Sequence, residues 1–257
     1  MPITSLGQVV PVLGVNLGSP GAVSKIPNPV IASRPVNSSA TLNLYFGDAA
    51  VVVPDVIGGS WLSVTDFLKT QANLANLAQY FAGFAVREVK TQLGYPLTYG
   101  GQTVGYYVAG EVGEVLEQGG ILVPLAAGTP QANLPAYMRV LTNALVSTVI
   151  GGIEAAEDVA ASTTATASAA STALTVASGT DILAGQAVVG NGIPANAYVT
   201  VVNGTAITIS AATTVALAGG TPVKFTRTVP VPHCVFKTGN VDANNVVEVI
   251  LLQRNSA

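Results

Sequence analysis

The sequence predicts an all-β fold: a β-barrel, jelly-roll-like or sandwich core with one short helix, and a small inserted β domain. Three observations lead to this prediction. The hydrophobic 49% of the chain is supplied by Ala and Val more than by Leu or Phe, and 27 Gly and 15 Pro are spread along it. Short alternating runs separated by Gly-rich turns recur from residue 41 onward. Such patterns favour strands joined by turns over long helices.

Residues 1–40 are predicted to form an extended N-terminal arm. They contain six Pro and four Gly residues and only two charged side chains, Lys25 and Arg34. This density of Pro and Gly excludes a regular helix. Because the segment cannot build a core of its own, we expect it either to lie on another surface or to pack as ordered coil on its own domain.

A β core domain is expected over residues 41–155 and 226–257. A helix is predicted over 64–80, where apolar residues recur at threes and fours and Ser63 or Thr65 is placed to cap it. Gly83 lies inside a strand pattern and predicts a bulge or a close backbone approach. The predicted strands are 41–46, 49–53, 81–89, 104–109, 112–117, 120–124, 231–236 and 246–252. The last of them is expected to close a sheet that begins before the insertion.

An inserted β domain is predicted over residues 174–225. The preceding residues 156–173 are rich in Ala, Ser and Thr and are interpreted as a connection, with a Thr-rich strand pair as the alternative. Asn203-Gly204 between two alternating runs is the strongest hairpin signal in the chain. The short strands expected here are 187–189, 198–202, 206–209, 215–217 and 223–225.

Composition also limits the function. Charged residues are 9% of the chain, against about a quarter in an ordinary soluble domain, and no basic stripe is present, so nucleic-acid binding is not expected. Apolar stretches are interrupted before about 18 residues accumulate, which argues against a membrane span. The N-terminus shows no secretory signal pattern, so we expect the protein to be made and kept inside a cell.

The candidates for catalysis are few. His233 and Cys234 are adjacent in a predicted strand and point to opposite faces, so they form no dyad or metal site by themselves. Glu111, Glu114 and Glu117 are the densest carboxylates and are interpreted as solvated strand ends, and the same reasoning makes Glu248 an edge or solvent-facing residue. No enzyme activity, cofactor or metal is expected. The shortage of charge instead indicates a subunit that covers much of its surface in an assembly.

Four segments resemble a known family. They are YFGDA at 45–49, FAGFAVRE at 81–88, YYVAGE at 106–111 and VLEQGGILV at 115–123. Their succession is similar to that of the structural cement proteins that decorate capsids of tailed bacteriophages, over roughly residues 30–128 and the final strand. The run GNGIPANAYV at 190–199, followed by AITIS at 206–210, is similar to a small β module of phage virion proteins.

The resemblance implies a virion protein that binds the outer surface of a phage capsid and cements neighbouring major capsid subunits. Its expected partners are the major capsid protein and further copies of itself, as a dimer or trimer on a local symmetry axis. The candidate capsid contacts are Val9, Val10, Val12, Leu13, Val15, Leu17, Ile26, Val30 and Ile31. The candidate outward-facing residues are Asn196, Tyr198 and Asn203.

Three alternatives remain open at this point. The inserted domain is the natural carrier of a host-surface or carbohydrate-binding function, as in a head fibre, adhesin or tail component. A polysaccharide-degrading enzyme would use carboxylates among Glu111, Glu114 and Glu117. A tail or head-completion protein differs from a cement protein mainly in copy number, which a sequence does not reveal.

Overall fold

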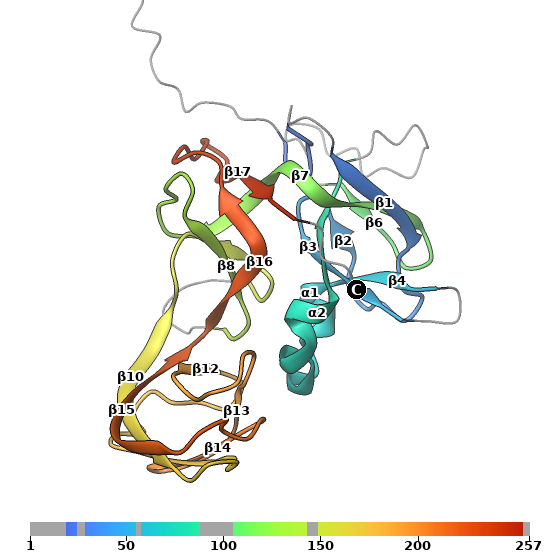
Figure 1. The fold of residues 1–257 in the computed structure, drawn as a ribbon. Coiled ribbons are helices and arrows are strands. Elements are labelled where there is room, and N and C mark those ends of the chain that lie inside the picture. Colours follow the sequence, from blue (N-terminus) through green and yellow to red (C-terminus); the bar gives the residue numbers. More distant parts are fainter. Residues whose placement is uncertain (1–18, 25–28, 55–57, 88–104, 143–148, 254–257) are drawn as a thin grey trace, which may run out of the picture.

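The computed structural model describes residues 19–24, 29–54, 58–87, 105–142 and 149–253, and these form a nine-stranded, a six-stranded and a two-stranded sheet (Figure 1). The predicted all-β fold with a barrel and little helix is confirmed. The strands of the nine-stranded sheet are β1 (Val30–Pro35), β3 (Ala49–Val53), β4 (Ser60–Ser63), β5 (Phe81–Ala85), β7 (Val112–Ala127), β8 (Pro135–Arg139), β9 (Ile153–Glu154), β16 (Thr228–Phe236) and β17 (Val246–Leu251).

Strand β7 is shared by two closed rings of strands. Its C-terminal half pairs with β17, and the pairing continues through β16, β8 and β9 back to β7, which we call the core ring. Its N-terminal half pairs with β5 and β1. From β5 the pairing passes through β3 and β4, and a bridge between Val36 and Trp61 returns it to β1, which closes the side ring. The expectation that the last strand completes an earlier sheet is confirmed by the β17–β7 pairing.

The sequence predicted two strands where β7 is a single strand of 16 residues. Gly119 and Gly120 do not form a turn, because both are paired with β17, opposite Leu251 and Ile250. The missing side chain of Gly119 instead admits Pro29, whose Cα would lie 3.2 Å from a Cβ at this position. The glycine therefore permits a close approach of another segment.

The predicted helix over 64–80 is broken into three pieces: α1 (Val64–Phe67), the 3-10 helix η1 (Gln71–Asn76) and α2 (Leu77–Tyr80). Ser63 caps α1 as expected, because its Oγ accepts a hydrogen bond from the Asp66 N–H at 3.2 Å. After α1, Asn73 donates its side-chain amide to the Phe67 carbonyl at 2.7 Å. Side-chain bonds of this kind compete with the helical backbone pattern and favour the break.

The six-stranded sheet is also closed. It contains β10 (Val159–Ala167), β11 (Ala173–Val176), β12 (Ala187–Gly190), β13 (Val199–Asn203), β14 (Ala206–Ile209) and β15 (Leu217–Thr226). Its two ends, β12 and β13, are joined through hydrogen bonds from the Val188 N–H to the Ala197 carbonyl and from the Val199 N–H to the Gln186 carbonyl, at 2.8 and 2.9 Å. We call this unit the six-stranded ring, and its closure protects the strand edges.

Two expectations for this region need correction. The Ala/Ser/Thr-rich segment is no connection but contains β10, which pairs with both β11 and β15. Thr and Ser are compatible with a strand, and only Ala165 among the residues of β10 is buried. Two separate strands were predicted at 215–217 and 223–225, but Leu217 and residues 223–225 belong to one continuous strand, β15, and residues 215–216 precede it. The hairpin at Asn203-Gly204 is confirmed, since β13 and β14 pair on either side of it.

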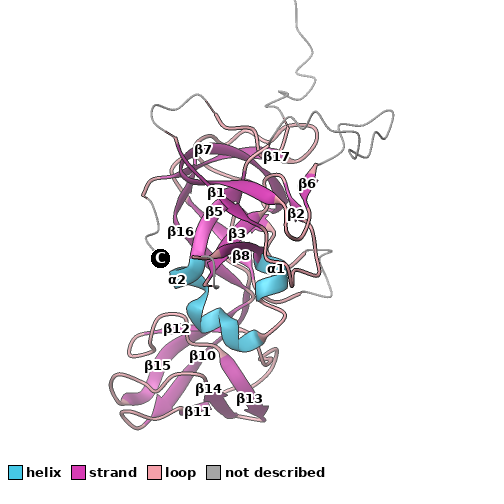
Figure 2. Cartoon of the chain, turned by 90° about the vertical axis from the view of Figure 1, so that its right-hand side faces the viewer, coloured by secondary structure: helices cyan, strands magenta, loops and turns pink. Residues whose placement is uncertain are grey.

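A buried charge cluster ties the six-stranded ring to the core ring. Arg139 on β8 is 1% exposed and binds the Glu154 carboxylate with two nitrogens, while its Nη1 donates to Asp158 Oδ2 at 2.8 Å. Asp158 directly precedes β10, and Arg227, 3.4 Å from its other oxygen, directly follows β15. Both chain crossings into the six-stranded ring are therefore fixed at one point. Figures 1 and 2 show the helical pieces between this ring and the nine-stranded sheet.

Candidate functional site

The residues that the sequence offered for catalysis are dispersed. His233 is exposed, with a φ of 52°. Cys234 is buried in the core, and burial raises the pKa of its thiol. Among the described residues, no three His, Cys, Asp or Glu side chains are grouped so that they could hold a metal ion. The described helices include none with the length and apolar character to cross a membrane.

Two carboxylates lie deeper than predicted. Glu117 is 5% exposed within β7 and is therefore not a solvated strand end. Glu248 lies on β17, between β7 and β16, and its carboxylate pairs with Lys237 Nζ at 2.5 Å. It is neither at an edge nor solvent-facing, because β17 has strand partners on both sides. Glu111 is partly exposed and accepts a hydrogen bond from the Val108 N–H at 3.0 Å.

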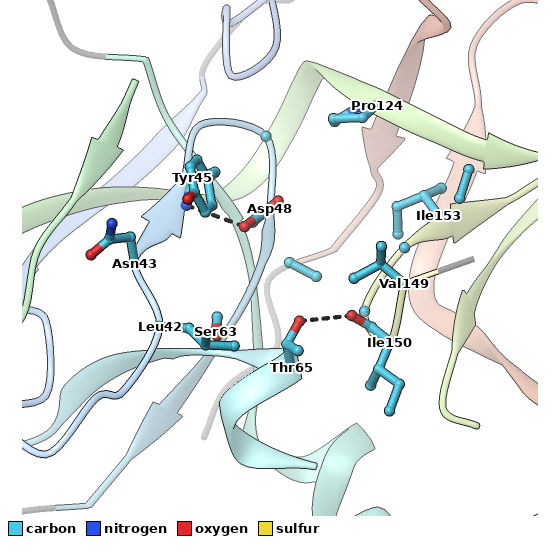
Figure 3. Close-up of a pocket in the computed structure, with 15 residues that line it drawn as sticks. Leu42, Asn43, Tyr45, Asp48, Ser63, Thr65, Pro124, Val149, Ile150 and Ile153 are labelled. Atoms are coloured by element: carbon cyan, nitrogen blue, oxygen red, sulfur yellow. Dashed lines mark hydrogen bonds between the residues drawn. The ribbon is translucent and has the colours of Figure 1, made fainter. Parts of the chain in front are cut away.

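An apolar pocket of about 330 Å³ opens where the two-stranded sheet meets the core ring (Figure 3). The two-stranded sheet consists of β2 (Leu44–Tyr45) and β6 (Tyr106–Tyr107). The pocket is lined by residues next to β2, by the start of α1, by β7 and by the segment leading into β9. Its lining residues are Leu42, Asn43, Tyr45, Gly47, Asp48, Ala49, Ser63, Thr65, Pro124, Ala126, Val149, Ile150, Gly151, Gly152 and Ile153.

Large hydrophobic side chains are exposed around this pocket. Leu42 is 41% exposed, Tyr45 42% and Val149 67%. The Tyr45 ring also makes an edge contact with Tyr106, at 5.3 Å between ring centres. Single exposed hydrophobic residues are ordinary on protein surfaces, but a group of them around an apolar hollow marks an interaction site. The pocket is therefore a candidate for binding an apolar partner.

The pocket has one charged lining residue, Asp48. Its carboxylate accepts a hydrogen bond from the Tyr45 N–H at 3.1 Å (Figure 3). Burial raises the pKa of Asp48 to about 7, although the hydrogen bond from Tyr45 lowers it in part. On the opposite side, the Thr65 hydroxyl donates to the Ile150 carbonyl at 2.7 Å and fixes that wall of the pocket. The carboxyl of Asp48 thus changes charge near neutral pH.

The N-terminal segment that the structure describes begins beside this pocket. Ser24 and Gly21 donate hydrogen bonds to Gly120 and Leu122 of β7, at 2.8 and 2.7 Å, so the segment runs antiparallel to the strand. The described segment starts with a turn, in which the Ala22 N–H donates a hydrogen bond to the Ser19 carbonyl at 3.1 Å. Gly21 has a φ of 77°, as the third position of such a turn requires.

Of the predicted capsid contacts, Val30 and Ile31 lie among the described residues. Val30 is partly buried on β1, and Ile31 next to it is 41% exposed. The remaining candidate contacts lie outside the described residues: Val9, Val10, Val12, Leu13, Val15, Leu17 and Ile26.

Of the candidate outward-facing residues, Asn196 and Asn203 are exposed, Asn203 in the β13–β14 turn. Tyr198 is placed differently from the expectation: it is partly buried and packs against the core cluster of the nine-stranded sheet. Its ring therefore helps to join the two parts of the molecule.

Sequence reasoning did not find the pocket, because its walls come from segments far apart in the chain. The turn at Gly47-Asp48 was visible only as the end of one strand and the start of another. Val149 and Ile150 stand at the end of an apolar run that gave no strand signal of its own. The local pattern that could have indicated the pocket was an acidic turn residue, Asp48, between two apolar strands.

The class of protein follows from a comparison with known families. The family model described as XM1 gp53 minor capsid protein matches residues 7–185. The match covers most of the arm, the side ring, the strands of the core ring that precede β10 and the first part of the six-stranded ring. The chain belongs to this family of phage capsid-associated proteins, and its role is a structural one in the virion. A search of curated proteins gave no match.

Proposed function

We propose that the protein is a non-enzymatic virion component that binds the outer surface of a phage capsid and cements neighbouring major capsid subunits. Membership in a minor capsid protein family supports a position in the capsid. The finer proposal is carried by the apolar side chains that are exposed on the pocket rim and on β1, together with the lack of charged residues at positions 1–24. Such a surface is buried at low desolvation cost, because few charges have to leave water.

The arm and β1 are the proposed contacts with the shell. Residues 1–24 include no Asp, Glu, Lys or Arg, and Ile31 on β1 is 41% exposed. An extended apolar arm and an exposed strand residue would together bury area on two neighbouring capsid subunits. The proposed partners are thus the major capsid protein and further copies of this chain, as a dimer or trimer.

Capsids that lack the protein provide the test. Wild-type protein, a variant without residues 1–18 and the variant Ile31→Asp are added to such capsids, and occupancy is measured by co-sedimentation and cryo-EM. We expect both variants to show lower occupancy and the capsids to lose the heat resistance that wild-type protein gives. Val201→Asp is the matched control, because Val201 is 55% exposed but lies on β13 of the six-stranded ring.

If both variants saturate the capsid and protect it from heat as wild-type protein does, the arm and β1 are not the shell contacts. If wild-type protein itself fails to bind capsids, the cementing proposal is wrong. If Val201→Asp is the single variant with low occupancy, the contact with the capsid lies on the six-stranded ring and not on the arm and β1.

A host-surface or carbohydrate-binding function is the second candidate. Exposed apolar side chains on the six-stranded ring favour it, with Leu183 53%, Val189 49% and Val215 50% exposed. Binding of the full-length protein to host cells, reduced by Val189→Asp and unaffected by Ile31→Asp, would support it. Equal binding of both variants would exclude this ring as the binding surface.

A further inference from the structure

The apolar pocket beside Asp48 is suited to an uncharged, apolar chain segment. Asp48 is the only charged residue among those that line it, and Leu42, Tyr45 and Val149 extend its apolar surface outward. A volume of about 330 Å³ is at the lower end of the range for ligand sites. A few aliphatic side chains would fill it, whereas a charged segment would lose hydration there.

The chain contains a segment of this chemistry. Residues 9–13 read Val-Val-Pro-Val-Leu, inside the stretch 1–24 that has no charged side chain. The Pro at position 11 fixes its own φ and disfavours a helical conformation at Val10, which lowers the entropy lost on docking. The described structure begins at Ser19, so this segment belongs to the preceding residues 1–18.

The turn that begins at Ser19 sets the direction in which the chain enters the described structure. Residues 22–24 run along β7 from Leu122 toward Gly120, and therefore away from Pro124 at the pocket. The turn from Ser19 to Ala22 reverses the chain. The chain therefore enters the turn at Ser19 from the Gly120 end of this stretch of β7 and not from the Pro124 end. This direction favours a pocket on another copy over the pocket of the same copy.

We propose that the arm of one copy inserts residues 9–13 into the pocket beside Asp48 of a neighbouring copy. An extended chain advances about 3.3–3.6 Å per residue, so Val12 reaches roughly 25 Å from Ser19. Neighbouring copies whose pocket lies within that distance would be linked arm to pocket. This inference rests on the proposed function and deepens it: residues 9–13 bind a neighbouring copy, and β1 with the rest of the arm is left for the capsid.

Disulfide trapping tests the link with the full chain. Two variants, Val12→Cys and Val149→Cys, are mixed, oxidised and run on a non-reducing gel, once as free protein and once on capsids. The native Cys234 is 2% exposed and does not interfere. In the mixture, a disulfide between positions 12 and 149, identified by mass spectrometry of the linked peptides, joins two different copies. We expect at least roughly tenfold more of this disulfide than with Val201→Cys in place of Val149→Cys, because docking raises the effective concentration of the thiols.

A second measurement separates docking from chance contact. Val12→Asp places a charge in the docking segment. If wild-type protein forms oligomers and this variant forms fewer of them under the same conditions, the link is supported. Leu42→Asp at the pocket rim, combined with Val149→Cys, should likewise abolish the trapped dimer with Val12→Cys.

The proposal is overturned if the double variant Val12→Cys/Val149→Cys forms the disulfide only within one chain, since the arm then covers its own pocket. It is also overturned if no disulfide between positions 12 and 149 forms in either sample, even where the cysteines link to the capsid protein. Capsid binding without trapping would leave the cementing function intact and remove the arm exchange.

Discussion

Single residues decide how closely the strands approach each other in this molecule. Gly83 on β5 is the clearest case, because a Cβ there would lie 1.8 Å from the carbonyl oxygen of Leu116. The prediction of a bulge or close approach at this position was possible because a glycine inside an apolar strand pattern typically marks one or the other. The partner strand could not be predicted, since Leu116 is far away in the sequence and no local pattern connects the two.

Gly83→Ala should destabilise the fold by about 3 kcal/mol, because the two backbones must move apart to admit the methyl group. The free energy of unfolding, measured by urea denaturation, checks this. Gly219→Ala is the control: the nearest atom to its Cβ would be Thr166 Cγ2 at 3.7 Å, and a change within about 1 kcal/mol is expected. Equal effects of the two substitutions would refute the close approach at β5.

Asp48 should make stability depend on pH near neutrality. Burial raises its pKa from 3.8 to about 7, so between these values the folded state binds a proton that the unfolded state has released. Stability therefore falls as the pH rises through this window. Asp48→Asn removes the titration, and we expect wild-type protein to lose stability relative to this variant from about pH 5 to about pH 7 in urea titrations.

Asp66 provides a control of opposite sign for this experiment. Burial acts to raise its pKa, but hydrogen bonds from Lys69 and Thr41 outweigh it and lower the pKa below 3.8. The stability that the ionised Asp66 carboxylate contributes is therefore lost only at a pH below this range. The stability difference between wild-type protein and Asp66→Asn should stay constant over the same range, and a parallel pH trend in both pairs would argue against Asp48 as the source.

At the scale of elements, local sequence signals predicted the strands better than their connections. The hairpin at Asn203-Gly204 was predictable because its turn chemistry is local. The continuity of β7 was not, since Gly119-Gly120 resembles a turn until β17 pairs with it. The segment that forms β10 has the composition of a linker, and only its pairing with β15 makes it a strand. The pocket joins segments around residues 45, 65, 124 and 150, and no local pattern predicts that these four segments meet.

The charge cluster at the junction of the two units should be essential to stability. Arg139→Met leaves Glu154 and Asp158 without their buried partner, and a loss of about 3–5 kcal/mol in the free energy of unfolding is expected. The double variant Arg139→Met/Glu154→Leu should recover part of this loss, because it removes one of the abandoned charges. Arg227→Met, at a partly exposed ion pair, should cost about 1 kcal/mol or less. A larger loss for Arg227→Met than for Arg139→Met would contradict this account of the junction.

At the scale of the whole molecule, the shortage of charge has a measurable consequence. With 9% charged residues and a formal net charge of −3, contacts with a shell would depend mainly on apolar burial. The composition was sufficient to predict an assembly subunit. The surface that assembles could not be located from composition alone, because exposed apolar residues occur on the pocket rim, on β1 and on the six-stranded ring.

Capsid binding should accordingly depend little on salt. Between about 0.1 and about 1 M NaCl we expect the affinity for capsids to change by less than about threefold, since screening acts on exposed charges and leaves apolar burial intact. Co-sedimentation at graded salt concentrations measures this. A steep fall of affinity with salt would instead indicate binding through the few exposed Lys and Arg side chains.

The sharing of β7 by two rings also has a mechanical meaning. Because one covalent backbone passes from the side ring into the core ring, a tensile load along β7 crosses between them without passing through a side-chain interface. The flanking strands β1 and β17 run antiparallel to β7, so their hydrogen bonds would be loaded together in shear and not opened one after another. Force spectroscopy with one handle on β1 and the other on β17 would load both sets of hydrogen bonds in shear and should find one cooperative rupture. A protein of this kind would resist the swelling of a shell under internal pressure.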